Sequence, residues 1–266
     1  MEHASSADGT QIAVHRIGTG RPVVIVGGAF STADAAGALV EAVAAEGFEG
    51  VSFDRRGRGD SGDATEGQRI APFSPEREAE DIAAVIDAVG GRAIVLGHSS
   101  GALVALLAAG HGVPIDHLFL SEPPLRFGTG EPPANLPQRL QALVDAGRGG
   151  EAVVLFQREG IGLPEPMIEQ LRSSPLFEHL TSLAQSTVYD AMIAAATSDP
   201  SAQLLSITVP TTVLVGVETM PLLARAAPML VERMPAAELV QVPESMHHVI
   251  DPPATAAIIA ARAASP

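Results

Sequence analysis

Residues 93–109 read AIVLGHSSGALVALLAA, and this stretch decides the fold. A short aliphatic run ends at Leu96, and an alanine- and leucine-rich helical pattern begins at Ser100. Between them the residues fit Gly-x-Ser-x-Gly in the strand–turn–helix setting that this motif requires. A bend this sharp needs glycine at positions 97 and 101, because larger side chains would collide with the neighbouring strand and helix. The pattern predicts that the Ser99 hydroxyl projects from the sheet edge as a candidate nucleophile.

A serine hydroxyl needs a base to accept its proton, and two histidines near the end of the chain are candidates. The strand pattern AELVQV, residues 237–242, is followed by PESMHHVIDPP, residues 243–253. His247 or His248 therefore lies on the loop that leaves the last strand, at the same sheet edge as Ser99. His98 lies inside the bend itself. We expect its side chain to point away from that of Ser99 and to serve in packing or hydrogen bonding.

The composition of this 266-residue chain excludes several kinds of chemistry. It has no Cys, which removes thiol nucleophiles, disulfides and Cys-bound metals. All 16 basic residues are Arg, which removes Schiff-base chemistry on lysine. No His and carboxylate residues have the spacing of a metal site, so we expect neither a metal nor a cofactor.

The charge of the chain limits its partners. A net charge of −15 repels nucleic acid and anionic membrane surfaces. The stretch MEHASSADGTQIAVH lacks the features of a signal peptide, and the longest apolar runs are about half the length of a membrane span. We expect a cytoplasmic protein whose partner is a small-molecule substrate. The oligomeric state stays open.

Short β-branched runs alternate with longer helical patterns, as in an α/β protein with helices on both faces of a parallel sheet. The alternation stops after Leu120 and resumes at Val209. We expect a core at residues 1–121 and 206–266, and a helical lid over the carboxyl edge of the sheet at residues 122–205. The expected strands are Gln11–Val14, Val23–Val26, Gly50–Phe53, Ala93–Leu96, His117–Leu120, Thr212–Val215 and Glu238–Val242. The expected helices are Ala33–Glu46, Pro75–Val89, Ser100–Ala109, Gln138–Ala146, Glu151–Glu159, Pro166–Arg172, Pro175–Asp190, Pro221–Arg233 and Pro253–Ala264.

Five motifs occur in the order typical of one family. They are VVIVGGAF at residues 23–30, DRRGRGDSG at 54–62, GHSSG at 97–101, SEPP at 121–124 and PESMHHV at 243–249. On these motifs the chain resembles the α/β-hydrolase-fold superfamily over nearly its whole length. It is most similar to small actinobacterial-type hydrolases with a GHSSG elbow and a Glu-Pro-Pro after the sixth strand.

This resemblance implies a role for each matching residue. Ser99 would be the nucleophile, and His247, the first of the histidine pair, the general base. The backbone amides of Ala29 and Ser100 would form the oxyanion hole. The serine nucleophile argues against haloalkane dehalogenases and epoxide hydrolases of this fold, whose members use Asp at that position.

The acid of the triad is where the sequence departs from the family pattern. Most members have an Asp after the strand that precedes the last one, but here TTVLVGVETMP places Thr219 at that position. Glu218 is one residue away from it. Glu122, in SEPP, follows the sixth strand, from which some branches of the fold take their acid. We favour Glu122, with Glu218 as the alternative acid.

One glycine motif has a competing interpretation. Residues 57–62 fit Gly-x-Gly-x-x-Gly after a strand, but a dinucleotide site needs a helix to begin there. The chain continues instead as DATEGQRIAPFSP, which is polar and interrupted by proline. We therefore interpret the segment as a tight structural loop held together by Asp54 and the arginines, and we expect Arg55, Arg56 and Arg58 to form an ion-pair network.

The sequence predicts a serine hydrolase that cleaves an ester, lactone or thioester of a small apolar or amphipathic molecule. Other activities of the fold stay open: a cofactor-free haloperoxidase or perhydrolase, a lyase or cyclase, and a non-catalytic ligand-binding protein. The substrate is not identified. Apolar residues of the lid are candidates for the pocket or for the lid's own core: Leu125, Phe127, Leu136, Leu155, Phe156, Ile161, Met167 and Phe177.

Overall fold

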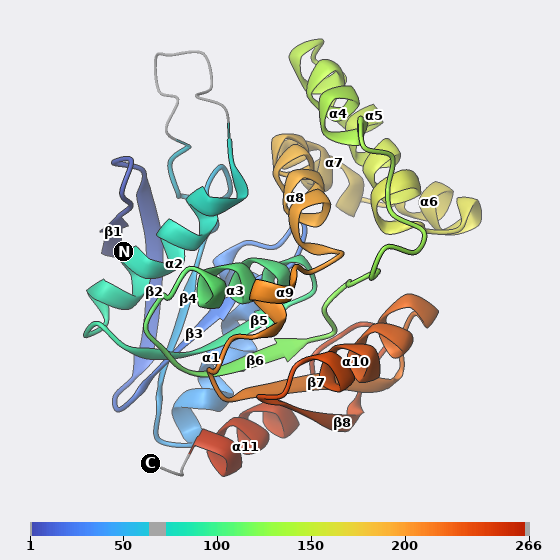
Figure 1. The fold of residues 1–266 in the computed structure, drawn as a ribbon. Helices are drawn as coiled ribbons and strands as arrows, with labels where there is room; N and C mark the ends of the chain where they lie inside the picture. Colours follow the sequence, from blue (N-terminus) through green and yellow to red (C-terminus); the bar gives the residue numbers. More distant parts are fainter. Residues whose placement is uncertain (1, 64–72, 264–266) are drawn as a thin grey trace.

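The computed structural model describes residues 2–63 and 73–263, which fold around one twisted sheet (Figure 1). The sheet has eight strands in the order β1-β2-β4-β3-β5-β6-β7-β8. β2 runs antiparallel to β1 and β4, and the strands from β4 to β8 run parallel to their neighbours. The strands are β1 Glu2–Ser5, β2 Gln11–Gly18, β3 Pro22–Val26, β4 Glu49–Phe53, β5 Ala93–His98, β6 Ile115–Ser121, β7 Thr211–Glu218 and β8 Ala237–Met246.

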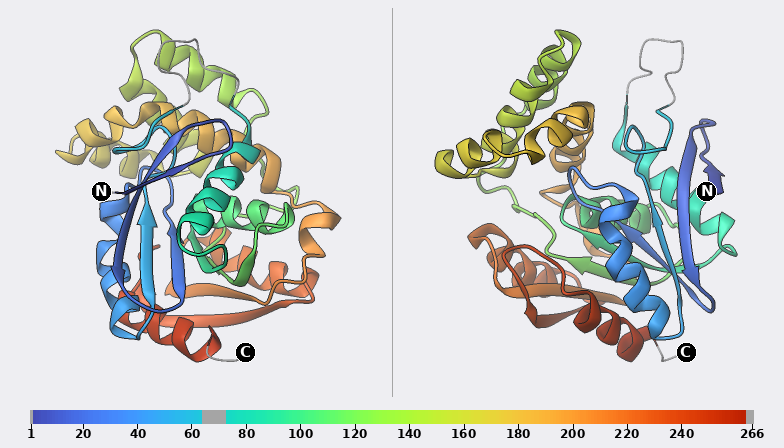
Figure 2. Two further views of the ribbon diagram at one scale, coloured as in Figure 1. Left: turned by 90° about the vertical axis from the view of Figure 1, so that its left-hand side faces the viewer. Right: turned by 180° about the vertical axis from the view of Figure 1, so that it is seen from behind.

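The central strands are apolar because helices cover both of their faces (Figure 2). Alternate residues of β3 show this: Val24 and Val26 join the core cluster that contains α2 and α3, whereas Val23 and Ile25 join the cluster that contains α1 and α11. This alternation is the period-two geometry of a strand. The covering helices are α1 Gly37–Ala45, α2 Pro75–Ala88, α3 Ser100–Gly110, α10 Pro221–Arg233 and α11 Pro252–Ala263, with the 3₁₀ helix η1 Ala33–Ala36 before α1.

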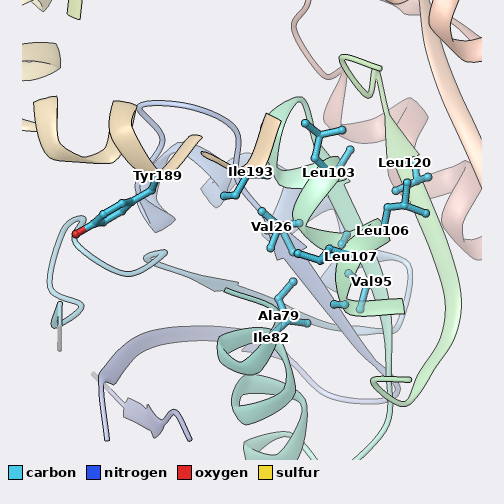
Figure 3. Packing of buried hydrophobic residues seen from close by; sticks show 14 of the residues in the cluster. Val26, Ala79, Ile82, Val95, Leu103, Leu106, Leu107, Leu120, Tyr189 and Ile193 are labelled. Atoms are coloured by element: carbon cyan, nitrogen blue, oxygen red, sulfur yellow. The ribbon is translucent and has the colours of Figure 1, made fainter. Parts of the chain in front are cut away.

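The segment between β6 and β7, residues 122–210 and here called the insert, is helical. Its first helices stand above the carboxyl edge of the sheet, while α8 and α9 contact α3 (Figures 1 and 2). In Figure 3, Ile193 of α8 lies beside Val26, whereas the Tyr189 ring of the same helix points away from Val26 and Leu103; all four residues belong to one buried cluster. The insert contains α4 Leu136–Asp145, α5 Gly149–Leu155, the π-helix η2 Phe156–Ile161, α6 Glu165–Arg172, α7 Leu176–Ser182, α8 Ala184–Thr197 and α9 Ala202–Leu205.

The fold class and the central elements predicted from the sequence are confirmed, and the α10 bounds match the prediction. The sequence interpretation missed β1, and it ended β8 at Val242 although the strand runs to Met246. Pro243 suggested that end, but β8 is an edge strand, where a proline nitrogen need not donate to a neighbour.

The insert also differs in detail from the prediction. The helix expected over Pro175–Asp190 is two helices, α7 and α8, which meet at Leu183. The helix expected over Glu151–Glu159 is α5 followed by a π-helix. The last residue of the expected final helix, Ala264, lies outside the described residues. Among the helices that the structure describes, none combines the length and the apolar character needed to cross a bilayer.

Candidate active site

Ser99 occupies the bend between β5 and α3, in a backbone conformation that few side chains adopt. Its φ is 54° and its ψ is −123°. The flanking glycines allow the bend. A Cβ on Gly97 would lie 2.4 Å from the carbonyl oxygen of Gly101, and a Cβ on Gly101 would lie 2.2 Å from that of Val26. The predicted reason for these glycines, a collision with the neighbouring helix and strand, is therefore confirmed.

The structure brings His248, and not His247, to Ser99. His248 Nε2 lies 3.0 Å from Ser99 Oγ. The side chain of His247 is 75% exposed, and its Nε2 lies 3.7 Å from Oε2 of Glu218. The preference for His247 was wrong because β8 extends to Met246, which pairs with Glu218 of β7. The turn therefore begins after Met246 and not, as expected, after Val242, and both histidines adopt positive φ, 53° and 64°.

Glu122 is the carboxylate that contacts the same imidazole. Its Oε2 lies 2.5 Å from Nδ1 of His248, and its Oε1 accepts a hydrogen bond from the Gly216 amide at 3.0 Å. Glu122 follows β6 in a left-handed conformation, with φ 48°. Burial raises the pKa of this carboxyl, but the hydrogen bonds from His248 and Gly216 outweigh burial, and the pKa is lowered. Glu122 is therefore an ionised acceptor at neutral pH.

This ionised acceptor fixes the roles of the two imidazole nitrogens. A carboxylate can only accept, so Nδ1 of His248 must carry the proton that it donates to Glu122. Nε2 of the neutral ring is then an acceptor and faces the Ser99 hydroxyl at 3.0 Å. The result is a hydrogen-bonded series in which a proton can pass from the serine to the histidine.

The alternative acid, Glu218, does not reach His248 in this structure. Its side chain is 58% exposed and lies beside His247. Thr219, which stands where most relatives have Asp, lies close enough to Glu122 for its hydroxyl to help lower the pKa of that carboxyl. Thr219 thus occupies the position of the usual acid, and its hydroxyl lies beside Glu122, the carboxylate that contacts His248 instead.

Two backbone amides next to Ser99 are free to bind an anion. Ala29 and Ser100 both line the cavity that contains Ser99 and His248. Neither amide donates a hydrogen bond to any acceptor in residues 2–63 or 73–263. Gly28 passes so close to Ser99 that a Cβ there would lie 3.0 Å from the serine Cβ. These are the two residues predicted for an oxyanion hole.

The cavity over Ser99 has a volume of about 230 Å³. It lies between the sheet edge and the insert, and its wall is mainly apolar. Of the lid residues named from the sequence, Leu136, Phe156 and Ile161 line it. Leu125 instead belongs to the buried core, and Met167 is exposed. The volume is below the usual range of pockets for drug-sized ligands, so the cavity suits a small molecule.

His98 lies against the triad instead of pointing away from it. Its ring centroid is 4.7 Å from that of His248, and its Nδ1 lies 3.1 Å from Ser121 Oγ. The predicted hydrogen-bonding role is confirmed, but the predicted direction is wrong. Burial and the neighbouring His248 lower the pKa of His98 to about 4. A neutral ring therefore packs beside the histidine that would carry charge during catalysis.

A buried ion-pair cluster lies on the other side of Ser99. Arg55 pairs with Glu78 of α2 and Asp190 of α8, and Arg58 pairs with the same Asp190. A separate pair joins Arg56 to Asp81 at 2.6 Å. The predicted ion-pair network is confirmed, but its partners on α2 and α8 were not foreseen. Asp190 was detectable as the single charge in the otherwise uncharged α8 stretch AQSTVYDAMIAAAT.

The glycine motif at residues 57–62 forms a closed loop. The Gly57 amide donates to the Gly62 carbonyl at 3.1 Å, and the carboxylate of Asp54 accepts from the amides of Ala33 and Asp60. Much of the stretch DATEGQRIAPFSP, on which the sequence argument also rested, lies outside the described residues. Within the described ranges no three His, Asp or Glu side chains are grouped so as to hold a metal ion.

Comparison with known proteins agrees with this architecture. The chain resembles a solved alpha/beta hydrolase from Sphaerobacter thermophilus DSM 20745, with 38% identity and a TM-score of 0.86 over 98% of this chain and 99% of that chain. A hydrolase from Pseudomonas aeruginosa PA01 (24% identity, TM-score 0.74, 99% and 98% coverage) shares the fold. So does an esterase from Exiguobacterium antarcticum (20% identity, TM-score 0.64, 92% and 91% coverage).

The search among curated proteins gave no match. The family comparison is more informative, because the alpha/beta hydrolase family matches residues 20–261, which is most of the chain. Together with the strand order and the nucleophile bend, this match establishes that the chain belongs to the alpha/beta hydrolase family.

Proposed function

We propose that this chain is a serine hydrolase that cleaves an ester, lactone or thioester of a small apolar or amphipathic molecule. The nucleophile is Ser99, the general base is His248 and the acid is Glu122. One observation carries the proposal: His248 contacts Ser99 Oγ at 3.0 Å through Nε2 and Glu122 at 2.5 Å through Nδ1. A small, mainly apolar cavity opens over this series.

The first half of the reaction acylates the serine. Ser99 Oγ attacks the substrate carbonyl carbon while its proton moves to Nε2 of His248. The imidazolium that forms is stabilised by the ionised Glu122, whose Oε2 already lies 2.5 Å from Nδ1. The amides of Ala29 and Ser100 bind the oxygen that becomes negative. The bond to the leaving group then breaks, and His248 gives its proton to the departing alcohol or thiol.

The second half releases the acid. Water loses a proton to Nε2 of His248 as its oxygen attacks the acyl carbon, and the Ser99 ester bond breaks with return of the proton to the serine oxygen. No external oxidant or metal takes part in this sequence. We propose that residues 122–205 act as a lid during both halves, since the insert forms part of the cavity wall.

Labelling of the nucleophile tests the proposal. The folded chain is treated with an alkyl fluorophosphonate and the labelled peptide is identified by mass spectrometry, in parallel with hydrolysis of short-chain nitrophenyl esters. We expect the label on Ser99 and a burst of nitrophenol. His248→Asn and Glu122→Gln should slow both readouts strongly. His247→Asn and Glu218→Gln are matched controls that should leave them unchanged.

Each other outcome contradicts a defined part of the proposal. No label on Ser99, combined with tight binding of a small ligand, would indicate a ligand-binding protein of this fold. Retention of activity in Ser99→Ala would indicate a lyase or cyclase in which His248 acts without an acyl-enzyme. Faster formation of peracid than of free acid, in the presence of hydrogen peroxide, would indicate a perhydrolase.

A further inference from the structure

Two arginines are among the largest fully buried side chains of the described residues, and both contact the loop that carries Gly27, Gly28 and Ala29. Arg55 and Arg58 are 2% and 1% exposed. Burying an arginine is costly unless each charge has a partner. Here the charges balance within one cluster, because two arginines face two carboxylates, Glu78 and Asp190. The cluster is therefore neutral as a whole, and its geometry is tightly fixed by its hydrogen bonds.

Arg58 holds the peptide group that carries the Ala29 amide. Its Nη1 donates to the carbonyl oxygen of Gly28 at 2.8 Å, and its Nη2 donates to Asp190 at 2.9 Å. In a trans peptide the carbonyl and the following N–H point in opposite directions. The bond to Gly28 therefore turns the Ala29 N–H away from Arg58. That N–H belongs to a residue of the cavity wall.

Arg55 holds the other side of the same site. Its Nη1 donates to Ser100 Oγ at 3.1 Å and to the Gly27 carbonyl at 3.3 Å, and its Nη2 lies 3.0 Å from Asp190 Oδ1. Asp190 thus joins the arginine that contacts Ser100 to the arginine that orients Ala29. The arginines beside the two proposed oxyanion donors therefore share one carboxylate, and that carboxylate belongs to α8 of the insert.

We infer that Arg58 and Asp190 are positioning residues that set the oxyanion hole, so that the hole is complete only while α8 is packed on α3. This inference rests on the proposed hydrolytic function. It assigns the insert a catalytic task beyond covering the substrate, because withdrawing α8 would remove Asp190, the carboxylate that both arginines share, and would leave Arg55 with Glu78 alone. The loop after β4, helix α2 and the insert would then all support the Ala29 and Ser100 amides.

The test compares this cluster with the neighbouring ion pair. Arg58→Lys and Asp190→Asn are measured beside Arg56→Lys and Asp81→Asn, whose pair is equally buried but does not contact Gly27, Gly28 or Ser100. For each variant we measure the melting temperature, kcat, KM and the Ki of an alkyl boronic acid, which forms a tetrahedral anion on Ser99. Losing a whole oxyanion donor costs about 10²–10³ in kcat, so a misoriented donor should cost about 10- to 100-fold.

We expect Arg58→Lys and Asp190→Asn to lower kcat and boronate affinity by the same factor with little change in KM. The control variants Arg56→Lys and Asp81→Asn should have a lower melting temperature, but their kcat and boronate affinity should stay within about threefold of the wild type. Equal kcat in the two sets, after correction for the folded fraction, would overturn the inference. If wild-type Ser99 is not labelled by fluorophosphonate, the proposed function fails first, so the two failures are distinguishable.

A second observation concerns the charge of the substrate and comes from a different residue. Arg126, on the insert, lines the same cavity as Ser99. Its Nη1 and Nη2 donate to the carbonyls of Gly130 and Gly160, at 2.6 and 2.8 Å. In the described residues it has no carboxylate within ion-pair distance, unlike the arginines of the cluster. Burial lowers its pKa, the charge of Glu131 offsets part of this, and the charge of Arg225 lowers the pKa further.

We propose that Arg126, in the wall of the cavity that contains Ser99, binds an anionic group of the substrate. A partly buried cation without an anion gains most when a ligand supplies one. The acidic surface of the chain repels anions at long range, so the claim concerns the cavity alone. The favoured substrate class is then a small monoester or thioester of a dicarboxylic acid. This proposal also rests on the hydrolytic function.

Matched esters test the second proposal. Mono-nitrophenyl glutarate carries a free carboxylate, and nitrophenyl pentanoate is the neutral ester of similar length. We expect the anionic ester to have the higher kcat/KM, and Arg126→Gln to lower that value by about 10- to 100-fold while the neutral ester changes less than threefold. Arg225→Gln, which removes a nearby exposed charge, is the control and should change neither ester strongly.

An equal loss for both esters in Arg126→Gln would mean that the arginine only ties the two loops together, which overturns the proposal. A higher kcat/KM of the wild type for the neutral ester would overturn it as well. Hydrolysis of neither ester would contradict the hydrolytic function itself, which the fluorophosphonate experiment examines separately.

Discussion

Two groups of charged residues flank Ser99, and they differ in how much solvent reaches them. On one side the His248 side chain is 26% exposed and its partner Glu122 is 5% exposed. On the other side Arg58 and Asp190 are 0% and 1% exposed. The first group has to change its charge during the proposed reaction and lies open to the substrate. The second group keeps fixed charges and is closed to water.

The difference separates two ways in which a protein uses charge. His248 is placed to move a proton because its Nε2 faces the Ser99 hydroxyl and its Nδ1 contacts Glu122. The arginine cluster gives no proton. It binds the carbonyls of Gly27 and Gly28 and the hydroxyl of Ser100, and we infer that its role is to orient the neighbouring amides. Substitutions in the first group should therefore abolish chemistry in a folded protein, whereas most substitutions in the second should act on stability or geometry.

The largest expected effect separates the two adjacent histidines. His248→Asn should lower kcat/KM by about 10⁵-fold or more, because the base and the nucleophile of such sites act as one unit. His247→Asn should change it less than threefold, since the side chain is exposed and lies beside Glu218, away from Ser99. Ester hydrolysis at saturating and limiting substrate checks both variants. Comparable losses in the two variants would show that the turn after β8 adopts another conformation in solution.

This pair of histidines also shows where prediction from sequence ended. The strand–turn–helix pattern located Ser99 to the residue, because the constraints on that bend are local and the glycines reveal them. The position of the base depends on where β8 ends, and that end is set by pairing of Met246 with Glu218 of β7. Such pairing is a long-range contact that no local pattern of β8 contains. An error of one residue then moves the histidine to the opposite side of the chain.

The acid and the ion-pair cluster show the same limit. Glu122 was favoured over Glu218 from its place after the sixth strand, and the structure brings it to His248. The arginines were recognisable as an ion-pair group, but their partners Glu78 and Asp190 lie 23 and 132 residues away along the chain from the arginines that they bind. Contacts over such separations follow from the packing of α2 and α8 on the core.

A smaller but still large effect should follow loss of the acid. Glu122→Gln keeps the shape but cannot stabilise the imidazolium, and it favours the wrong tautomer of His248. We expect kcat to fall about 10⁴-fold, as for an amide in place of the acid in comparable triads. Glu218→Gln is the control and should be close to wild type. The double variant Glu122→Ser with Thr219→Asp should regain activity relative to Glu122→Ser, because it restores the family's usual acid position.

The control ion pair should respond in stability alone. Asp81→Asn leaves Arg56 buried and only partly compensated, by Asp8. Breaking a buried pair by removing one partner costs about 3–5 kcal/mol in the free energy of unfolding. Urea denaturation should show this loss, while kcat per folded molecule stays near that of the wild type. A large loss of kcat at full folding would mean that the two ion-pair groups are not functionally distinct.

The smallest expected effect concerns His98, whose ring packs against that of His248. Burial, together with the neighbouring His248, lowers its pKa to about 4 in the folded chain, whereas the unfolded chain has the ordinary value near 6.5. Between these pH values the unfolded chain binds the proton more strongly, so the contribution of His98 to stability is complete above pH 6.5 and is lost as the pH falls toward 4. Because the ring is partly exposed, we expect a loss on the order of 2 kcal/mol.

His98→Asn should remove this dependence while it keeps a polar group near Ser121. Denaturant unfolding at pH 7.0, 5.5 and 4.5 measures the free energy of unfolding of both proteins. As the pH falls, the free energy of unfolding should decrease more for the wild type than for His98→Asn. A parallel decline in the two proteins would assign the acid sensitivity to the carboxylates instead. In that case solvent would reach His98 as it reaches His248. Only the arginine cluster would then be shielded from water.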